Sequence, residues 1–172
     1  MTHFTASLLG GGVVAAVLTY WLNGRRARRE FLVTKLEETY DAVRLFAGDS
    51  RRKYIGPVGQ YLLEKISFPS LGEQLTTGKE IEYRRKAEML IRLYFPEVQL
   101  AFDQLNSTWT SVFKLCARVQ YQGGIANETE RTECLEIWNT ESADFDDKVT
   151  TLEDALFKLS KQFSYRGKTR WF

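Results

Sequence analysis

A stretch without charge near the N-terminus, residues 4–22, constrains this chain more than any other feature. Its sequence is FTASLLGGGVVAAVLTYWL, and as an α-helix rising about 1.5 Å per residue it would be roughly 28 Å long. The hydrocarbon core of a bilayer is about 30 Å thick, so this length fits a transmembrane helix. The sequence therefore predicts one membrane span at residues 4–22, preceded by an external N-terminus at residues 1–3.

An arginine block follows the uncharged stretch and distinguishes an anchor from a cleavable signal peptide. A signal peptide carries its positive charge before the apolar part, whereas here the charge comes after it. By the positive-inside rule, the block stays in the cytoplasm with everything that follows it. We therefore expect a single-pass protein of the cell inner membrane, with a basic juxtamembrane segment at residues 23–30. The residues expected to set this topology and to contact lipid headgroups are Arg25, Arg26, Arg28 and Arg29.

Small residues recur at four-residue intervals within the predicted span. Such a strip allows a second helix backbone to approach closely, so it favours a homo-oligomer. The alternative is that small residues are simply common in membrane helices and form such strips by chance. The residues predicted to pack in the membrane are Ser7, Gly11, Gly12, Ala15 and Ala16.

Hydrophobic periodicity predicts an all-α cytoplasmic domain at residues 31–163. Apolar residues spaced by three and four over residues 33–47 continue the anchor as one long helix, which we expect Gly48 to end as a C-cap. Glycines and prolines interrupt the pattern over residues 49–78, leaving at most one short helix near residues 60–66.

A second long helix is predicted from a capping box formed by Thr77 and Glu80, and it should end at Gly123. Pro96 should kink this helix or break it, with a new helix starting at the proline. The second half carries an apolar seam spaced by four and three, typical of a helical bundle. The seam consists of Val98, Phe102, Leu105, Trp109, Val112, Cys116 and Val119.

The aromatic residues beside Pro96 are the one local anomaly that suggests a site. Tyr94 and Phe95 next to a helix-breaking proline are able to form a partner-binding groove or a hinge. Packing of these rings into the core at a kink is the competing interpretation.

A third long helix should start at a second capping box, formed by Asn127 and Glu130. Its seam runs from Leu135 to Phe163, and a short connection to the previous helix predicts antiparallel packing. With the first helix as a further wall, the expected fold is an elongated three- or four-helix antiparallel bundle. Residues 164–172, SYRGKTRWF, form a basic aromatic tail that is frayed, docked, or in contact with membrane or partner.

The sequence shows no catalytic or metal-binding pattern. The only histidine, His3, falls outside the predicted cytoplasmic domain, and no phosphate-binding glycine motif follows a strand. The carboxylates are expected to form a solvated face, and Cys116 and Cys134 are expected to be reduced and half-buried. We therefore expect neither an enzyme nor a cofactor. With 24 Lys and Arg against 22 Asp and Glu, the net charge of +2 also argues against nucleic acid as a partner.

Two functional hypotheses fit these features. The first is a non-enzymatic scaffold that holds an unknown cytoplasmic protein, or further copies of itself, at the membrane. The second is a membrane-perturbing effector of the toxin or anti-phage defence type, acting through clustering of its glycine-rich span. Leucine at Gly11 and Gly12 would abolish growth arrest by an effector but would only weaken the self-association of a scaffold. The overall pattern is similar to that of small bacterial inner-membrane proteins with an anchored helical domain, a class resemblance that assigns no residue a role.

Overall fold

Helices account for all regular structure in the part of the chain that the computed structural model describes, as the sequence predicted. The described backbone covers residues 2–75 and 79–165, and the described side chains cover residues 16–75 and 79–163. The elements are α1 (Thr2–Ser50), a π-helical turn (Arg51–Ile55), α2 (Gly56–Leu62), α3 (Phe68–Gln74), α4 (Glu80–Tyr94), a 3-10 turn (Pro96–Val98), α5 (Gln99–Tyr121) and α6 (Glu128–Tyr165).

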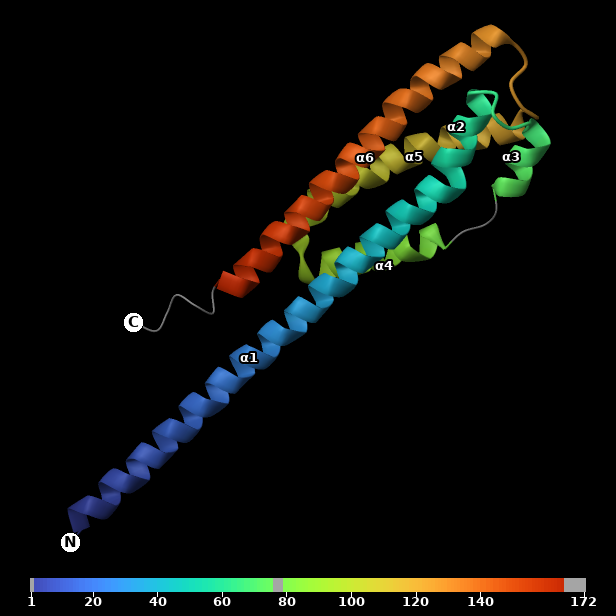
Figure 1. Ribbon diagram of the computed structural model, residues 1–172. Helices are drawn as coiled ribbons and strands as arrows, with labels where there is room; N and C mark the ends of the chain where they lie inside the picture. Colours follow the sequence, from blue (N-terminus) through green and yellow to red (C-terminus); the bar gives the residue numbers. More distant parts are fainter. Residues whose placement is uncertain (1, 76–78, 166–172) are drawn as a thin grey trace.

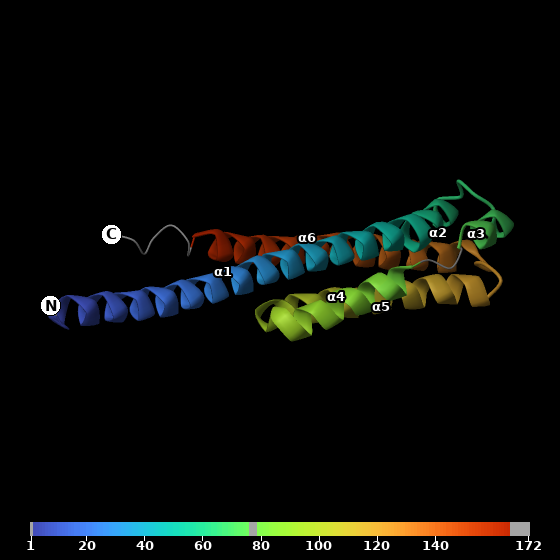
Figure 2. The same ribbon diagram turned by 90° about the horizontal axis from the view of Figure 1, so that it is seen from below.

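The four long helices run alternately in opposite directions (Figure 1). Helix α4 packs antiparallel along α1. Helix α5 then runs back beside α4, and α6 packs antiparallel along α5 and also contacts α1. Seen from below, α1 and α6 lie on one side of the bundle, with α4 and α5 on the other (Figure 2). The N-terminal part of α1 projects from the bundle at the end where α6 finishes, which we call the basal end. The opposite end, with α2, α3 and the connection before α6, is the apical end.

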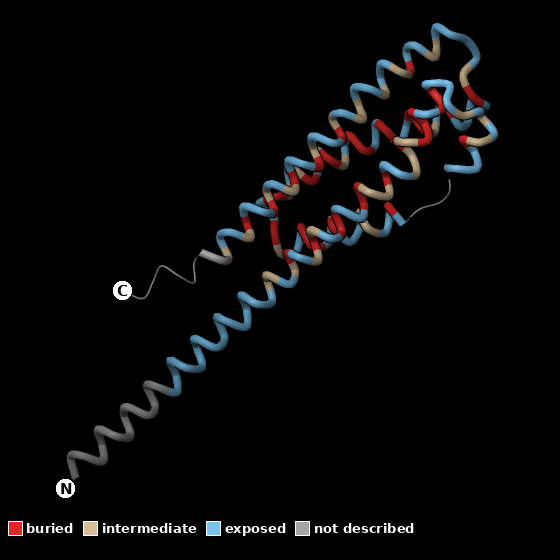
Figure 3. The backbone as a smooth tube through the Cα atoms, viewed as in Figure 1, coloured by how far each residue is buried: buried red, intermediate tan, exposed pale blue. Residues whose placement is uncertain are grey.

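The core lies along the bundle axis, and the projecting part of α1 has no share in it (Figure 3). At its centre, the fully buried ring of Phe46 on α1 makes T-shaped contacts with Trp109 on α5 and Phe145 on α6, with centroids 5.7 and 6.1 Å apart. All seven residues of the predicted α5 seam are buried, which confirms that seam. On α6 the seam is buried from Phe145 to Leu159 and half-buried at both ends.

Gly48 does not end the first helix, so that prediction is wrong. Helix α1 passes through Gly48 and continues, through the π-helical turn, into α2. The buried face continues with it through Ile55 and Val58, so packing favours the helix over a cap at Gly48. In the π-helical turn the Gly56 N–H bonds to the Arg51 carbonyl, a five-residue step immediately before Pro57. Proline clashes with the carbonyl four residues earlier in an α-helix, and this wider turn accommodates it.

Residues 49–78 hold more helix than the sequence predicted. Helix α2 lies where the glycines and Pro57 suggested a loop, and it ends at Leu62 rather than continuing to residue 66. Helix α3 contains Pro69 in its first turn, where a missing N–H costs nothing, and the Ser67 hydroxyl accepts a hydrogen bond from the Ser70 N–H. Pro57 and Pro69 therefore lie in the first turns of helices and do not interrupt them.

At Pro96 the chain breaks the helix and reverses. Helix α4 ends before Phe95, whose φ of −137° and ψ of 53° are not helical, and a 3-10 turn starts at the proline. The Arg84 Nη1 on α4 donates to the Asn106 Oδ1 on α5 at 2.7 Å, which places the two helices side by side. The predicted break is confirmed, and it forms the corner of a helical hairpin.

Glu80 does not act as a capping residue, contrary to prediction. Its side chain is 1% exposed, and its Oε1 accepts a hydrogen bond of 2.9 Å from the Tyr54 hydroxyl. Burial and this bond to Glu80 raise the pKa of Tyr54 to about 12. Thr77, the other half of the predicted capping box, lies outside the described residues.

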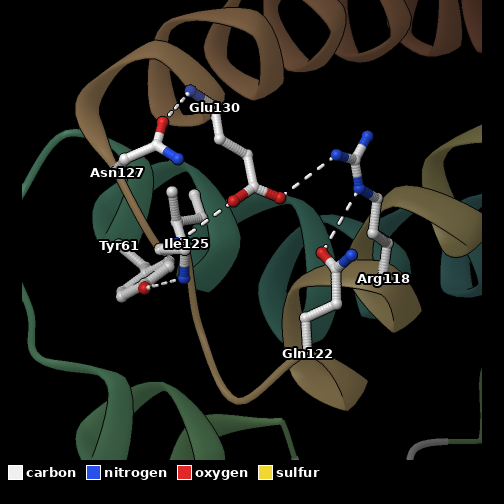
Figure 4. A network of polar contacts seen from close by, with 7 residues as sticks. Tyr61, Arg118, Gln122, Ile125, Asn127 and Glu130 are labelled. Atoms are coloured by element: carbon white, nitrogen blue, oxygen red, sulfur yellow. Dashed lines mark hydrogen bonds and ion pairs between the residues drawn. The ribbon is translucent and has the colours of Figure 1, made fainter.

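The second capping box, at the start of α6, is confirmed (Figure 4). The Glu130 N–H donates to the Asn127 Oδ1 at 2.9 Å, while the Glu130 carboxylate accepts from the Ala126 N–H and from Arg118. Gly123 and Gly124 precede it with φ of 73° and 105°, the left-handed conformation that ends α5. The Tyr61 hydroxyl accepts from the Ile125 N–H at 2.9 Å, which ties this connection to α2.

Across the described residues, no helix contains a stretch long and apolar enough to cross a membrane. The predicted span starts at Phe4, so its residues 4–15 lie outside the described side chains.

Candidate membrane-proximal site

The projecting part of α1 exposes apolar side chains that no other described element covers. Every residue from 16 to 30 is exposed (Figure 3). Val17, Tyr20 and Trp21 are exposed by 62%, 84% and 49%. Large exposed apolar side chains on a helix that no other described element covers are typical of a segment that is buried by something outside the chain. This is the described end of the predicted span at residues 4–22.

The arginine block continues this segment without a break in the helix. The Arg25 guanidinium lies 3.6 Å from the centroid of the Trp21 ring, a cation–π contact that holds an aromatic and a charge together. The Arg26 Nε pairs with the Glu30 Oε1 at 2.8 Å. Arg28 and Arg29 are exposed on the same stretch. The predicted headgroup contacts are thus gathered on one helix, next to an aromatic pair typical of a membrane boundary.

The strip of small residues in the predicted span is described only at one end. Ala16 is exposed, and Ser7, Gly11, Gly12 and Ala15 lie outside the described side chains. The packing of this strip, on which both the predicted self-association and the membrane-perturbing alternative depend, remains a prediction.

The aromatic residues beside Pro96 pack into the basal end of the bundle. Phe95 is fully buried, and its ring lies 6.4 Å from that of Phe163 at the end of α6. Tyr94 contacts the edge of Phe31 on α1, with centroids 5.5 Å apart. Pro96 itself is exposed. These contacts favour core packing at a corner over the predicted groove or hinge.

No family model, curated protein or solved structure matches this chain.

The carboxylates that the sequence predicted to form a solvated face separate into paired and unpaired groups. No set of His, Cys, Asp and Glu among the described residues is arranged to hold a metal ion.

A hydrogen bond from the Thr108 hydroxyl lowers the pKa of the Asp144 carboxyl. Paired carboxylates include Glu38 with Lys35, Asp146 with Arg51, and Asp144 and Asp147 with Lys148. Within the described part of the chain, Glu37 has no such partner.

A groove between α1 and α6 near the basal end was missed by sequence reasoning. It encloses about 660 Å³, and its lining alternates apolar and acidic side chains from both helices. Its members are about 120 residues apart in the sequence, so only the packing of α6 on α1 brings them together. The lining residues from α1 are Val33, Leu36, Glu37, Tyr40 and Asp41, and those from α6 are Glu153, Asp154, Leu156, Phe157 and Ser160.

The two thiols are more deeply buried than predicted. Cys116 is 2% exposed and Cys134 is 1% exposed, and they are unbonded to one another. Burial raises the pKa of the Cys116 thiol to about 12 and also raises the pKa of Cys134. A thiol rather than a thiolate is poorly nucleophilic, so neither residue has the environment of a reactive cysteine.

Both native thiols are therefore expected to resist modification by a disulfide reagent at pH 8 while the chain is folded. Labelling with a disulfide reagent should proceed only in denaturant, when both react. A Ser111→Cys variant, with its new thiol exposed on α5, should label at once and shows that the reagent is active. Rapid labelling of the unmodified folded chain would show that the α5 seam opens readily.

Proposed function

We propose that this chain is a non-enzymatic, membrane-anchored scaffold that holds a cytoplasmic partner, or further copies of itself, at the inner membrane. In this proposal residues 4–22 span the bilayer, the N-terminus lies outside, and the helical bundle lies in the cytoplasm. The observation that carries it is the uncovered apolar stretch at residues 16–22, which passes within one continuous helix into the exposed arginine block.

The geometry of α1 supports an anchor that is rigidly joined to the bundle. The helix is unbroken from Thr2 to Ser50, and its second half supplies buried side chains to the core, including Leu36, Val43 and Phe46. The same helix thus carries the predicted span, the exposed arginines and one wall of the bundle. A bend or break at residues 23–30 would instead be typical of a bundle joined to its anchor by a flexible linker.

The bundle begins on α1 and finishes on α6 at the same end, the basal end, which faces the membrane in this proposal. Helix α6 finishes at Tyr165 at the basal end, where α1 enters the bundle (Figures 1 and 2). The end of α6 therefore lies at the same end of the bundle as the predicted anchor.

Removal of the arginine block is expected to disturb the orientation of the chain in the membrane. With glutamine at all four positions, Lys35 is the nearest positive charge on the cytoplasmic side of the span, so the charge bias is much weaker and a large fraction of molecules should invert. A C-terminal reporter that fluoresces only in the cytoplasm should lose most of its signal, and a phosphatase fusion active only outside should gain it. The four substitutions are Arg25→Gln, Arg26→Gln, Arg28→Gln and Arg29→Gln.

A matched control removes four exposed positive charges from the bundle instead. These positions lie too far from the span to affect topology, so both reporters should give unchanged signals. Release of the unmodified chain from membranes by alkaline carbonate, or an external C-terminus, would contradict the proposal. The control substitutions are Arg52→Gln, Arg85→Gln, Lys86→Gln and Lys114→Gln.

A further inference from the structure

We propose that the groove between α1 and α6 is the docking site for the chain's own C-terminal segment, residues 166–172. The groove presents an acidic rim and an apolar floor, and this segment is basic and aromatic. The docking is a property of the bundle and does not depend on the membrane anchor.

The rim of the groove carries four carboxylates that lack a partner. Within the described part of the chain they make no hydrogen bond and no ion pair, whereas neighbouring carboxylates such as Glu38 and Asp144 pair with lysines. No Lys or Arg lines the groove. Since the four charges have one sign and lie along two adjacent helices, they attract a cationic segment. The four residues are Glu37, Asp41, Glu153 and Asp154.

The floor of the groove is apolar and partly uncovered. Leu36 and Leu156 are buried beneath it, while Phe157 is 56% exposed. Cations already lie over both aromatic rings of the lining: the Lys161 Nζ is 4.3 Å from the Phe157 centroid, and Arg44 lies 5.7 Å from that of Tyr40. Rings in this setting favour cations and aromatic groups as neighbours.

The composition of the C-terminal segment complements both parts of the groove. The segment has no acidic residue, and Arg166, Lys168 and Arg170 alternate along it. These three suit the carboxylate rim, and Trp171 with Phe172 suits the apolar floor. A segment with this alternation has too few apolar residues to form a core of its own.

The segment also starts in the right place and is long enough. Helix α6 ends at Tyr165, five residues after Ser160, which lines the groove. From Tyr165 back to Glu153 the helix rises about 18 Å, at about 1.5 Å per residue. Seven residues span up to about 23 Å when extended, so the segment reaches every carboxylate on α6. Gly167, second in the segment, permits the reversal of direction this path requires.

The test is disulfide trapping in the full-length, detergent-solubilised chain. A Ser160→Cys/Thr169→Cys variant places one thiol in the groove and one in the middle of the segment. Docking raises the local concentration of the second thiol at the first, so an intrachain disulfide should form several times faster than in a control pair. The control is Gln162→Cys/Thr169→Cys. Position 162 is exposed and lies about 200° around α6 from position 160, yet it is closer to the segment in sequence.

Neutralising the rim provides an independent readout. Glu37→Gln, Asp41→Asn, Glu153→Gln and Asp154→Asn together should reduce the trapping rate to that of the control pair. A matched set of unpaired, exposed carboxylates outside the groove should leave the rate unchanged: Glu73→Gln, Glu97→Gln, Glu133→Gln and Glu136→Gln. Rising salt should slow trapping, because exposed charges are screened.

Three results would overturn the proposal. Equal rates for the two cysteine pairs would show that the segment has no preference for the groove. A disulfide-linked dimer as the main product would show that the segment docks on a second copy. A trapping rate that is unaffected by the four groove substitutions but is lowered by added anionic vesicles would assign the segment to the membrane surface.

Discussion

Replacing Phe46 by alanine is expected to lower the free energy of unfolding by about 3–5 kcal/mol. The ring is fully buried and lies where α1, α5 and α6 meet, in T-shaped contact with Trp109 and Phe145. Its removal leaves a cavity between helices that are fixed by other contacts, so little collapse is possible. Urea unfolding of the detergent-solubilised chain, followed by far-ultraviolet circular dichroism, measures the change.

The neighbouring residue supplies the control for this prediction. Leu45 is on the same turn of α1 but is 49% exposed, so Leu45→Ala should change the free energy of unfolding by less than about 0.5 kcal/mol. Similar losses for the two variants would mean that α1 does not present the Phe46 face to the bundle.

Gly59→Ala is expected to destabilise the chain by about 1–3 kcal/mol, the usual cost of overpacking. A Cβ atom at this position would lie 2.8 Å from both Cε2 and Cη2 of Trp138. The indole cannot easily move aside, because its Nε1 donates a hydrogen bond to the Ile55 carbonyl at 3.2 Å. Helix α2 must therefore shift away from α6. The loss of indole fluorescence on unfolding reports the stability.

Gly48→Ala provides the opposite case in the same continuous helix. Nothing lies within 4 Å of a Cβ added there, so alanine should only improve helix propensity and stabilise the chain by about 0.5–1 kcal/mol. In a Trp138→Ala background, Gly59→Ala should lose its cost, since the two residues act through one contact. Equal effects of Gly59→Ala in both backgrounds would contradict the close packing of α2 on α6.

The strongly periodic helices could be predicted because burial and sequence pattern agree in them. The seam from Val98 to Val119 has apolar residues at every expected position, and each is buried. The capping pair at Asn127 and the two glycines before it are local signals that need no tertiary contact. These elements were predicted correctly for that reason.

Residues 49–78 could not be predicted from the same rules. Glycine and proline there were interpreted as breakers, but a π-helical turn accommodates Pro57, and Pro69 takes a first-turn position. Glu80 looked like a capping residue from its spacing, yet tertiary packing buries it against Tyr54. The two prolines occupy local backbone positions that tolerate a missing N–H, whereas for Glu80 a contact from elsewhere in the fold outweighed the local preference.

The two candidate sites also differ in whether the sequence could predict them. The arginine block and the exposed apolar stretch before it lie in one contiguous segment, so the sequence alone identified them. The groove combines residues 33–41 with residues 153–160, and it exists only because α6 packs on α1. The available signal was the set of acidic residues beside two apolar seams, which by itself indicates only a solvated face.

The continuity of α1 with the π-helical turn and α2 has a further consequence for the anchored protein proposed above. From Leu22 to Leu62 this rod is about 60 Å long, at about 1.5 Å per residue. Anything that binds near Gly124 or α3 would be held at a nearly constant height above the lipid, because no hinge intervenes. The chain would thus work as a spacer of defined length, and its reach would change in steps when whole helical turns are inserted into α1.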